Sequence, residues 1–182
     1  ESFLSNFRGS YQFLIALFLC IFVQCNSYPK GMEKFELTIL GCGSALPTTR
    51  HFATSQVINI REKLYMIDCG EGAQLQMRRS RLKFSRLNHV FISHLHGDHC
   101  FGLIGLISTF GLLGRTAPLY VHAPAAFGPI LQSLLGFFCK GLDFRVEFYP
   151  VDTSRHALIH EDRSVSIYSI PCLLYTSPSP RD

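Results

Sequence analysis

The sequence lacks the features that mark a membrane span, a disulfide-rich scaffold or a zinc ribbon. Its longest uninterrupted apolar run, Phe13–Val23, is too short to cross a bilayer as a helix. Seven cysteines are scattered along the chain without a Cys-x-x-Cys pair. This pattern argues against a disulfide framework and fits buried free thiols in a reducing, cytoplasmic compartment. The formal net charge of +4 permits a polyanionic partner without requiring one.

The composition of the chain is that of one globular domain. Both ends differ in sequence character from the part between them. The 182 residues are 47% apolar and 16% charged, which is enough for a sizeable core. Met32 opens a strand-like pattern, so residues 1–31 are interpreted as upstream translation or a leader; a signal-peptide core at Phe13–Val23 is the alternative. The turn-rich residues 172–182 resemble the translation of a sequencing-library adapter. We therefore expect the domain to occupy residues 32–171.

Hydrophobic periodicity predicts an α/β fold in which strands dominate. Alternating or short apolar runs predict strands at 35–39, 56–60, 64–68, 90–92, 119–122, 144–151, 157–160 and 165–170. Longer stretches predict helices at 71–84, 101–113 and 130–139. No internal repeat is evident, and the pattern suits a sheet-rich α/β sandwich.

The loop after the strand at 90–92 carries the residues best suited to chemistry, His94, His96, Asp98 and His99. In an extended segment residues two apart point the same way, so His94 and His96 can present two imidazoles to one metal ion. Gly97 lets the chain bend, so that Asp98 and His99 can reach a second ion. Two divalent ions about 3.5 to 4 Å apart can activate a shared hydroxide and stabilise both oxygens of a phosphodiester displacement. A merely polar loop is the alternative, which the spacing and the buried strand disfavour.

This loop, with Ser93 before it, resembles the signature of the metallo-β-lactamase superfamily. The segment 68–72, Asp-Cys-Gly-Glu-Gly, resembles the upstream aspartate motif of that superfamily. A narrower resemblance to the ribonuclease Z family rests on Leu40-Gly-Cys-Gly-Ser-Ala-Leu-Pro47 and on the segment 101–106. The resemblance covers about residues 35–171 and implies a metallo-β-lactamase αββα sandwich, of which the chain holds the N-terminal portion.

The family resemblance implies a function and a setting. It implies a zinc-dependent endoribonuclease that hydrolyses a phosphodiester at the 3′ end of precursor tRNA, acting as a homodimer in the cytoplasm without a membrane. It also implies that His94 and His96 bind one zinc ion, that Asp98 and His99 bind the other, and that Asp98 is the base for the attacking water. Imidazole and carboxylate ligands favour zinc without excluding manganese. Asp68 is implied to buttress the histidine loop, although a plain turn aspartate is equally compatible.

Two departures from the family pattern affect these expectations. The third metal-binding His, a bridging Asp, a final His and an RNA-clasping arm are expected beyond Pro171, and the sequence does not contain them. We therefore expect the 182 residues alone to bind zinc weakly and to lack nuclease activity. The loop 47–52 matches the Pro-x-Lys-x-Arg-Asn pattern of bacterial members only at its proline, so Arg50 or His51 would substitute as substrate contacts.

Further contacts to RNA are expected from the helix at 71–84. Arg78 and Arg79 open a basic run that continues to Arg86, which would hold tRNA phosphates; an ordinary solvated face is the alternative. The other histidines, His89, His122, His156 and His160, are expected to be structural or surface residues. Two other functions remain open: a different phosphodiesterase or hydrolase of the superfamily, and a catalytically dead RNA-binding or dimerisation module.

Overall fold

The computed structural model describes residues 21–25, 35–44, 46 and 48–171. It divides the chain into two compact units. The larger unit comprises Glu33–Asp152, and the smaller one combines Glu1–Met32 with Thr153–Asp182. Each unit is described by itself.

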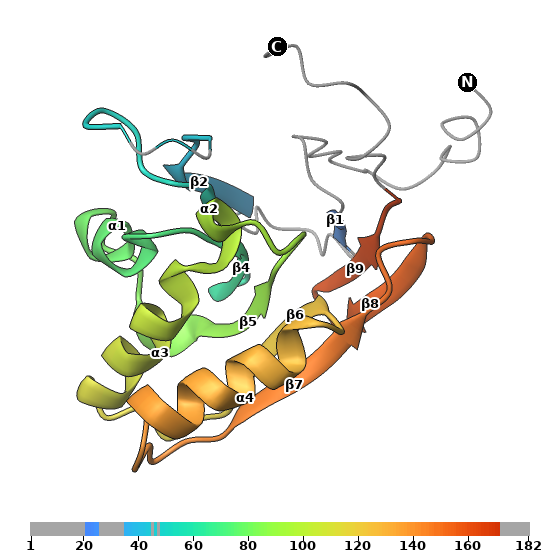
Figure 1. The fold of residues 1–182 in the computed structure, drawn as a ribbon. Helices are drawn as coiled ribbons and strands as arrows, with labels where there is room; N and C mark the ends of the chain where they lie inside the picture. Colours follow the sequence, from blue (N-terminus) through green and yellow to red (C-terminus); the bar gives the residue numbers. More distant parts are fainter. Residues whose placement is uncertain (1–20, 26–34, 45, 47, 172–182) are drawn as a thin grey trace, which may run out of the picture. The chain divides into compact units, whose positions relative to one another are not determined.

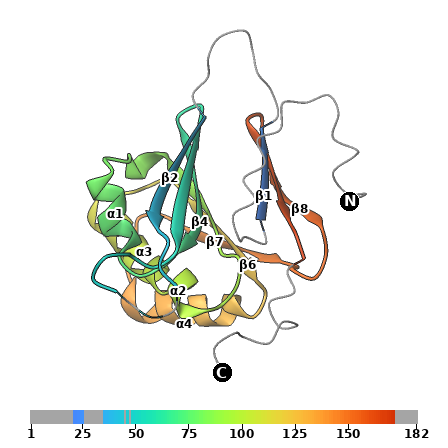
Figure 2. The ribbon, with the colours of Figure 1, turned by 90° about the horizontal axis from the view of Figure 1, so that it is seen from above.

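The larger unit is built on one six-stranded sheet whose strands lie side by side in chain order (Figures 1 and 2). The first three strands pair in antiparallel fashion, and the pairs from the third strand to the sixth are parallel. The strands are β2 (Phe35–Gly41), β3 (Ser55–Ile60), β4 (Lys63–Cys69), β5 (Leu87–Phe91), β6 (Leu119–Pro124) and β7 (Val146–Val151). The parallel half brings the carboxyl ends of β4, β5 and β6 to one edge of the sheet, the usual place for a ligand site in such sheets.

The strands β3 and β4 form an antiparallel hairpin. Its two-residue turn consists of Arg61 and Glu62, which have φ angles of 51° and 64°. Positive φ at both central residues matches the right-handed twist of the flanking strands. The hairpin forms here without the glycine or asparagine that this turn usually uses.

The α-helices of the described part of this unit connect the parallel strands and cover one face of the sheet (Figure 1). They are α1 (Ala73–Arg79), α2 (Gly97–Cys100), α3 (Gly102–Leu112) and α4 (Phe127–Phe138), with a short 3-10 helix, η1 (Phe84–Arg86), before β5. Alternate strand residues such as Met66, Val90 and Val121 meet buried helix residues such as Met77 and Leu106 in one continuous core. Burial of this apolar surface fixes which face of the sheet the helices cover.

The helix predicted at 71–84 is wrong in extent, because α1 ends at Arg79. The N–H of Leu82 donates to Met77 O at 3.0 Å and that of Arg81 donates to Arg78 O at 3.0 Å. Arg81 itself is left-handed, with φ of 56°. This is a Schellman termination, which normally places glycine at the left-handed position. Of the basic run, Arg78 and Arg79 therefore lie in α1, whereas Arg86 ends η1 and forms an ion pair with Glu62.

The remaining predicted elements are confirmed with shifted ends. The strand expected at 90–92 begins at Leu87, and the helix expected at 101–113 is α3, preceded by the single turn α2. The helix at 130–139 begins earlier, at Phe127, and the strand at 144–151 begins later, at Val146.

The smaller unit contains a three-stranded antiparallel sheet in the order β1-β9-β8. Its strands are β1 (Ile21–Cys25), β8 (Ala157–Glu161) and β9 (Val165–Ser169). Ile21–Cys25 belongs to the stretch interpreted as foreign to the domain, yet it pairs along β9 from Ile21↔Ser169 to Cys25↔Val165. The rest of residues 1–31, and residues 172–182, lie outside the described residues, so the predicted boundaries stay predictions. Among the described residues, no helix has the length and apolar character of a membrane span.

Candidate metal centre

The histidine loop lies at the carboxyl end of β5 and leads into α2. The last backbone bond that holds this end to β6 runs from Ile92 N to His122 O at 2.8 Å. The chain bends at His94, is extended at His96, with φ of −78° and ψ of 146°, and then turns into α2 at Gly97. A strand that ends in a helical turn explains how one short loop can present side chains in two directions.

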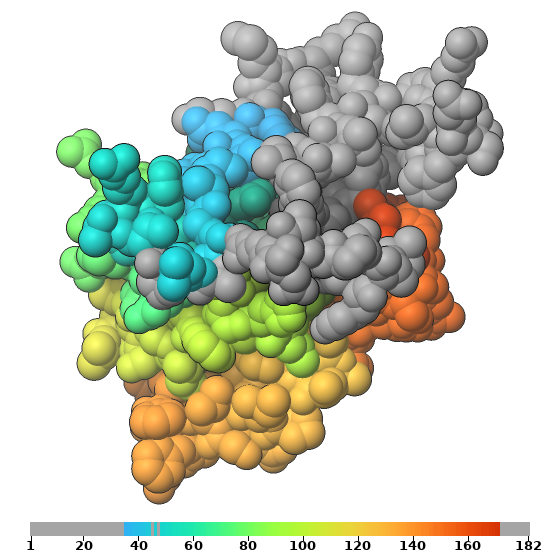
Figure 3. Space-filling model, turned by 45° about the horizontal axis from the view of Figure 1, so that its top comes forward, coloured from blue at the N-terminus to red at the C-terminus, as the bar shows by residue number. Residues whose placement is uncertain are grey.

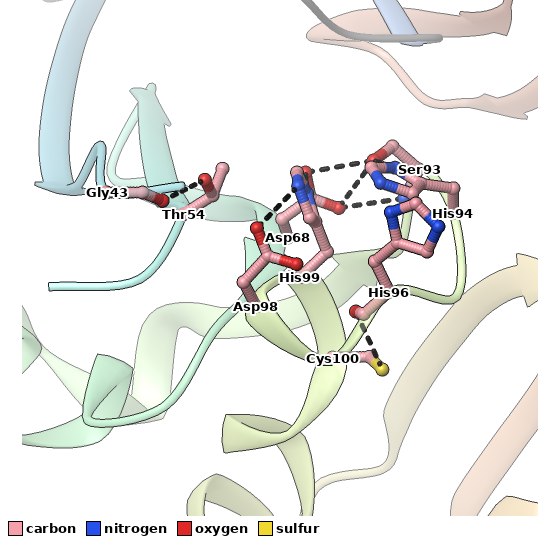
Figure 4. Close-up of polar contacts among 9 residues, drawn as sticks. All are labelled: Gly43, Thr54, Asp68, Ser93, His94, His96, Asp98, His99 and Cys100. Carbon is pink, nitrogen blue, oxygen red and sulfur yellow. Dashed lines mark hydrogen bonds and ion pairs between the residues drawn. The ribbon is translucent and has the colours of Figure 1, made fainter. Parts of the chain in front are cut away.

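The four predicted metal-binding side chains come together in this loop (Figure 4). The ring centroid of His94 lies 4.7 Å from that of His96 and 3.9 Å from that of His99. The Oδ2 atom of Asp98 lies 3.5 Å from Nε2 of His99. Three imidazoles and one carboxylate thus share one small volume, a donor set typical of zinc and of other divalent transition metals.

Asp68, at the end of β4, ties this loop to the neighbouring strand. Its carboxylate is fully buried, so it requires hydrogen-bond donors to offset the loss of hydration. Its Oδ1 accepts from Ser93 N at 2.8 Å and its Oδ2 accepts from Nδ1–H of His99 at 2.7 Å. Of the two interpretations of Asp68, the geometry supports the buttress. Its φ of 56°, which aspartate tolerates better than most residues, turns the side chain toward the loop.

Ser93 extends the same network to a second histidine. Its hydroxyl lies 2.9 Å from both carboxylate oxygens of Asp68 and 3.0 Å from Nδ1 of His94. The carboxylate can only accept, so the hydroxyl donates to Asp68 and accepts from Nδ1–H of His94. In their neutral forms, both His94 and His99 then carry their proton on Nδ1 and present Nε2 as the ligand atom. Such anchoring of the distal ring nitrogen is typical of metal-binding histidines, and these residues therefore fit a metal.

The pKa values of the two anchored histidines shift in opposite directions. Burial, reinforced by the neighbouring His99, lowers the pKa of His94. Burial also acts to lower the pKa of His99, but the hydrogen bond and charge of Asp68 outweigh it and raise that pKa. Burial, with the charges of Asp68 and Asp98, raises the pKa of the nearby Cys100 thiol to about 11. That thiol therefore stays protonated, and it donates to His96 O at 3.3 Å.

A cavity of about 920 Å³ opens beside the histidine loop. One wall comes from the segment between β2 and β3 and the other from the histidine loop and the start of α3, which adjoin in the space-filling view (Figure 3). Close approach of the backbones near this cavity requires glycine at Gly70 and Gly102, since a Cβ on Gly102 would lie 1.9 Å from Gly70 O. The lining residues are Ser44, Leu46, Thr48, His51, Phe52, Ala53, Glu71, Gly72, Leu95, His96, Gly97, Asp98 and Phe101.

Some of the predicted substrate contacts line this cavity and others do not. His51 lines it, whereas Arg50, Arg78 and Arg79 do not. Arg79 contacts it indirectly, because its guanidinium lies 5.4 Å from the ring centroid of Phe52, a lining residue. His51 also lies 4.0 Å, measured from Nδ1, from the Sγ atom of Cys42.

The other histidines are not metal-loop residues, as expected, but they are not isolated. His89 and His122 lie on adjacent strands with Nδ1 of one 3.2 Å from Nε2 of the other. His89 stacks on Tyr120 at 4.9 Å between ring centroids, and His156 stacks on Tyr168 at 5.2 Å. A structural role for these histidines stays a prediction.

Sequence reasoning missed three residues of the site. Ser93 belongs to the recognised motif, but its link to His94 and Asp68 depends on a strand pair that the sequence does not reveal. Phe52 and Phe101 line the cavity, and both would pass for core residues in a sequence. The position of Phe101 close behind His99, the last residue of the metal loop, was the signal in the sequence that could have pointed to it.

Comparison with known proteins places the chain in a family. The sequence model of the family described as Anti-Pycsar protein Apyc1 matches residues 35–134, more than half of the 182 residues. The chain belongs to this family. The ribonuclease Z of Bacteroides thetaiotaomicron is 71% identical over 140 residues, which are 77% of this chain and 44% of that protein. The chain thus spans less than half the length of this relative.

Solved structures share the fold of this chain. The short form of human tRNase Z superposes with a TM-score of 0.62 at 27% identity, over 75% of this chain and 63% of that one. The metallo-β-lactamase fold protein YhfI from Bacillus subtilis gives a TM-score of 0.51 at 16% identity, over 66% of this chain and 47% of that one. The predicted metallo-β-lactamase fold and the predicted resemblance to ribonuclease Z are confirmed.

Proposed function

We propose that the protein is a zinc-dependent endoribonuclease that hydrolyses a phosphodiester at the 3′ end of precursor tRNA. The observation that carries the proposal is the buried network of Asp68 and Ser93, which anchors Nδ1 of His94 and His99 and turns their Nε2 atoms to metal binding beside His96 and Asp98. A network of this kind supports a metal-dependent enzyme, because it orients two imidazoles for metal coordination beside an open cavity. The tRNA substrate is supported by the relatives named ribonuclease Z.

The four loop residues would hold two zinc ions. His94 and His96 would bind one ion, and Asp98 and His99 would bind the other. When bound, the ions would lower the pKa of a coordinated water and stabilise charge on the phosphodiester oxygens. Asp68 would keep the His99 ring in one orientation, because its buried carboxylate is itself held by the backbone N–H and the hydroxyl of Ser93 (Figure 4).

Asp98 would orient the attacking water and accept its proton. Its carboxylate is largely shielded, with 13% of the side chain exposed, yet it lines the cavity. A carboxylate at the boundary between the metal loop and an open cavity can meet both a water and the scissile phosphate. This position supports Asp98 over Glu71, a second carboxylate of the cavity wall that lies outside the loop.

The cavity would receive the 3′ end of the RNA, and the surface around it would hold the backbone. His51, which lines the cavity, would contact the terminal nucleotides, while Arg50, Arg78 and Arg79 would contact phosphates nearby. The cysteines Cys42, Cys69, Cys100 and Cys139 are free thiols, which supports a reducing cytoplasmic compartment. Assembly as a homodimer belongs to the same proposal and rests on the family resemblance.

The proposal is tested by metal-dependent cleavage of a precursor tRNA with the full-length protein. After removal of metal with a chelator, adding back zinc should restore cleavage at the junction between the tRNA and its 3′ trailer, mapped by sequencing the product ends. Manganese is added back in a parallel experiment, because the same donor atoms would bind it. Hydrolysis of small phosphodiesters without tRNA cleavage would instead favour a different phosphodiesterase of the superfamily. Binding of tRNA without cleavage in any metal would contradict the enzyme assignment.

A further inference from the structure

Two large apolar side chains of the cavity wall are exposed beside the metal loop. Leu46 is 74% exposed and Phe101 is 73% exposed, and both line the cavity that His96 and Asp98 also line. A single exposed apolar residue is common on protein surfaces. An exposed aromatic ring within a cavity that also contains the reacting groups is a better candidate for a ligand contact.

The position of Phe101 is set by the backbone rather than by burial. The residue joins α2 to α3 with φ of −65° and ψ of −24°, and its N–H donates to Gly97 O at 2.9 Å. Its ring lies directly against Gly97, where a Cβ would stand 2.3 to 2.7 Å from three ring carbons. The ring therefore rests on the metal loop itself, at the glycine between His96 and Asp98, with most of its surface uncovered.

Phe52 provides a useful contrast in the same cavity. Its ring is only partly exposed, because it packs against Gly72, where a Cβ would lie 2.9 Å away, and under the Arg79 guanidinium at 5.4 Å. Phe52 is thus a residue of the cavity wall whose ring already packs against Gly72 and Arg79. Of the two phenylalanines that line the cavity, Phe101 is the one that still offers a free surface for stacking.

We propose that the ring of Phe101 is the stacking surface for the nucleobase next to the scissile phosphate, which would make it a substrate-positioning residue. The inference rests on the proposed function, since it takes the ligand to be single-stranded RNA at the tRNA 3′ end. Proteins recognise such strands by stacking unpaired bases on aromatic side chains. Stacking tolerates every base because each has a π-face, so it would suit an enzyme whose trailers differ in sequence. A base held on Gly97 and Phe101 would bring its phosphate to the loop that carries Asp98.

The test compares base-containing and abasic substrates in the full-length, metal-loaded protein. Phe101→Leu removes the ring and keeps an apolar side chain, whereas Phe101→Tyr keeps the ring. Phe137→Leu is the matched control, because Phe137 is 76% exposed on α4 and does not line the cavity. Each variant is assayed with a precursor tRNA, and with precursors that carry an abasic residue on one or the other side of the cleaved bond.

With the intact precursor, Phe101→Leu should weaken binding about 5- to 150-fold, the range that base stacking on an aromatic ring supplies. With one of the abasic precursors, the same substitution should change binding by less than about twofold, because no base remains to stack there. Phe101→Tyr and Phe137→Leu should behave as wild type on all substrates, and circular dichroism should confirm that the variants are folded.

The outcomes separate the two proposals. If the wild-type protein does not cleave precursor tRNA, the proposed function fails, and this inference fails with it. If the wild-type protein cleaves, but Phe101→Leu weakens intact and both abasic precursors equally or weakens none of them, stacking on Phe101 is refuted while the proposed function stands.

Discussion

The Oδ2 atom of Asp68 lies 2.7 Å from Nδ1 of His99, across two parallel strands and 31 residues of sequence. The bond orients a predicted metal ligand from a fully buried residue that does not line the cavity beside the loop. Loss of such a partner typically reduces metal affinity by about 10- to 100-fold. The candidate metal centre therefore depends on two segments of the chain, the histidine loop and the end of β4.

Asp68→Asn tests this relationship in the full-length protein. The amide keeps an oxygen that can accept from Ser93, but it places a donor opposite the Nδ1–H of His99. Zinc affinity, measured by competition with a chromophoric chelator, should fall about 10- to 100-fold. The matched control is Asp143→Asn, an exposed aspartate before β7 at the opposite edge of the sheet. Equal affinities in wild type and Asp68→Asn would mean that the bond does not orient the ligand.

Arg78→Ala combined with Arg79→Ala tests the phosphate contacts proposed for the end of α1. If both residues bind RNA phosphates, tRNA affinity should fall, and the slope of log affinity against log salt should flatten by about 0.7 to 0.9 for each phosphate that is no longer neutralised. Cleavage of bound tRNA should change little. Of the single variants, Arg79→Ala should have the larger effect, because Arg79 also supports Phe52 in the cavity wall.

The control for that experiment removes two positive charges elsewhere. Lys140→Ala with Arg145→Ala changes the net charge equally, and both residues lie in the exposed connection before β7, away from the carboxyl edge of the sheet. The same flattening of the slope in the control would identify a general charge effect. An unchanged slope in Arg78→Ala plus Arg79→Ala would show that this end of α1 is an ordinary solvated surface.

Arg115→Met tests what holds the loop between α3 and β6. The buried guanidinium donates to the carbonyl oxygens of Ala117, Leu87 and Pro118 and to Oδ1 of Asn88, at 2.6 to 2.9 Å. Methionine fills the same space but leaves these buried acceptors unpaired, at about 1–3 kcal/mol each when no water replaces the donor. We expect the free energy of unfolding in urea to fall by about 3 kcal/mol or more, because several acceptors lose their donor at once. A decrease below about 1 kcal/mol, the cost of a single unpaired acceptor, would show that water or rearranged backbone satisfies these carbonyls.

The sequence predicted the strands, the helices and the metal loop because each is a local pattern. His94 and His96 follow from a period of two in an extended segment, and Gly97 marks the turn into α2. The end of α1 could not be predicted in this way, because its left-handed residue is Arg81 rather than glycine. Leu82, the residue after it, packs partly buried against the core, so tertiary packing terminates this helix.

The rest of the site depends on contacts between distant segments. The position of Asp68 could be anticipated only from the family resemblance, since the pairing of β4 with β5 decides which residue meets His99. Phe101 looked like the first residue of a buried helix, whereas the structure leaves 73% of it exposed. Its exposure follows from the break between α2 and α3, which turns this one side chain away from the core and onto Gly97.

The most direct test of the proposed nuclease centre is the single-turnover rate of precursor tRNA cleavage by full-length Asp98→Ala protein, with RNA affinity measured in parallel. Asp98 is assigned as ligand and base but makes no assigned contact to the RNA backbone, so its removal should affect chemistry and spare binding. We predict that cleavage is abolished while the dissociation constant for tRNA stays within about threefold of wild type, the size of a minor contact. A cleavage rate close to that of wild type would contradict the assignment of this loop as the catalytic metal centre.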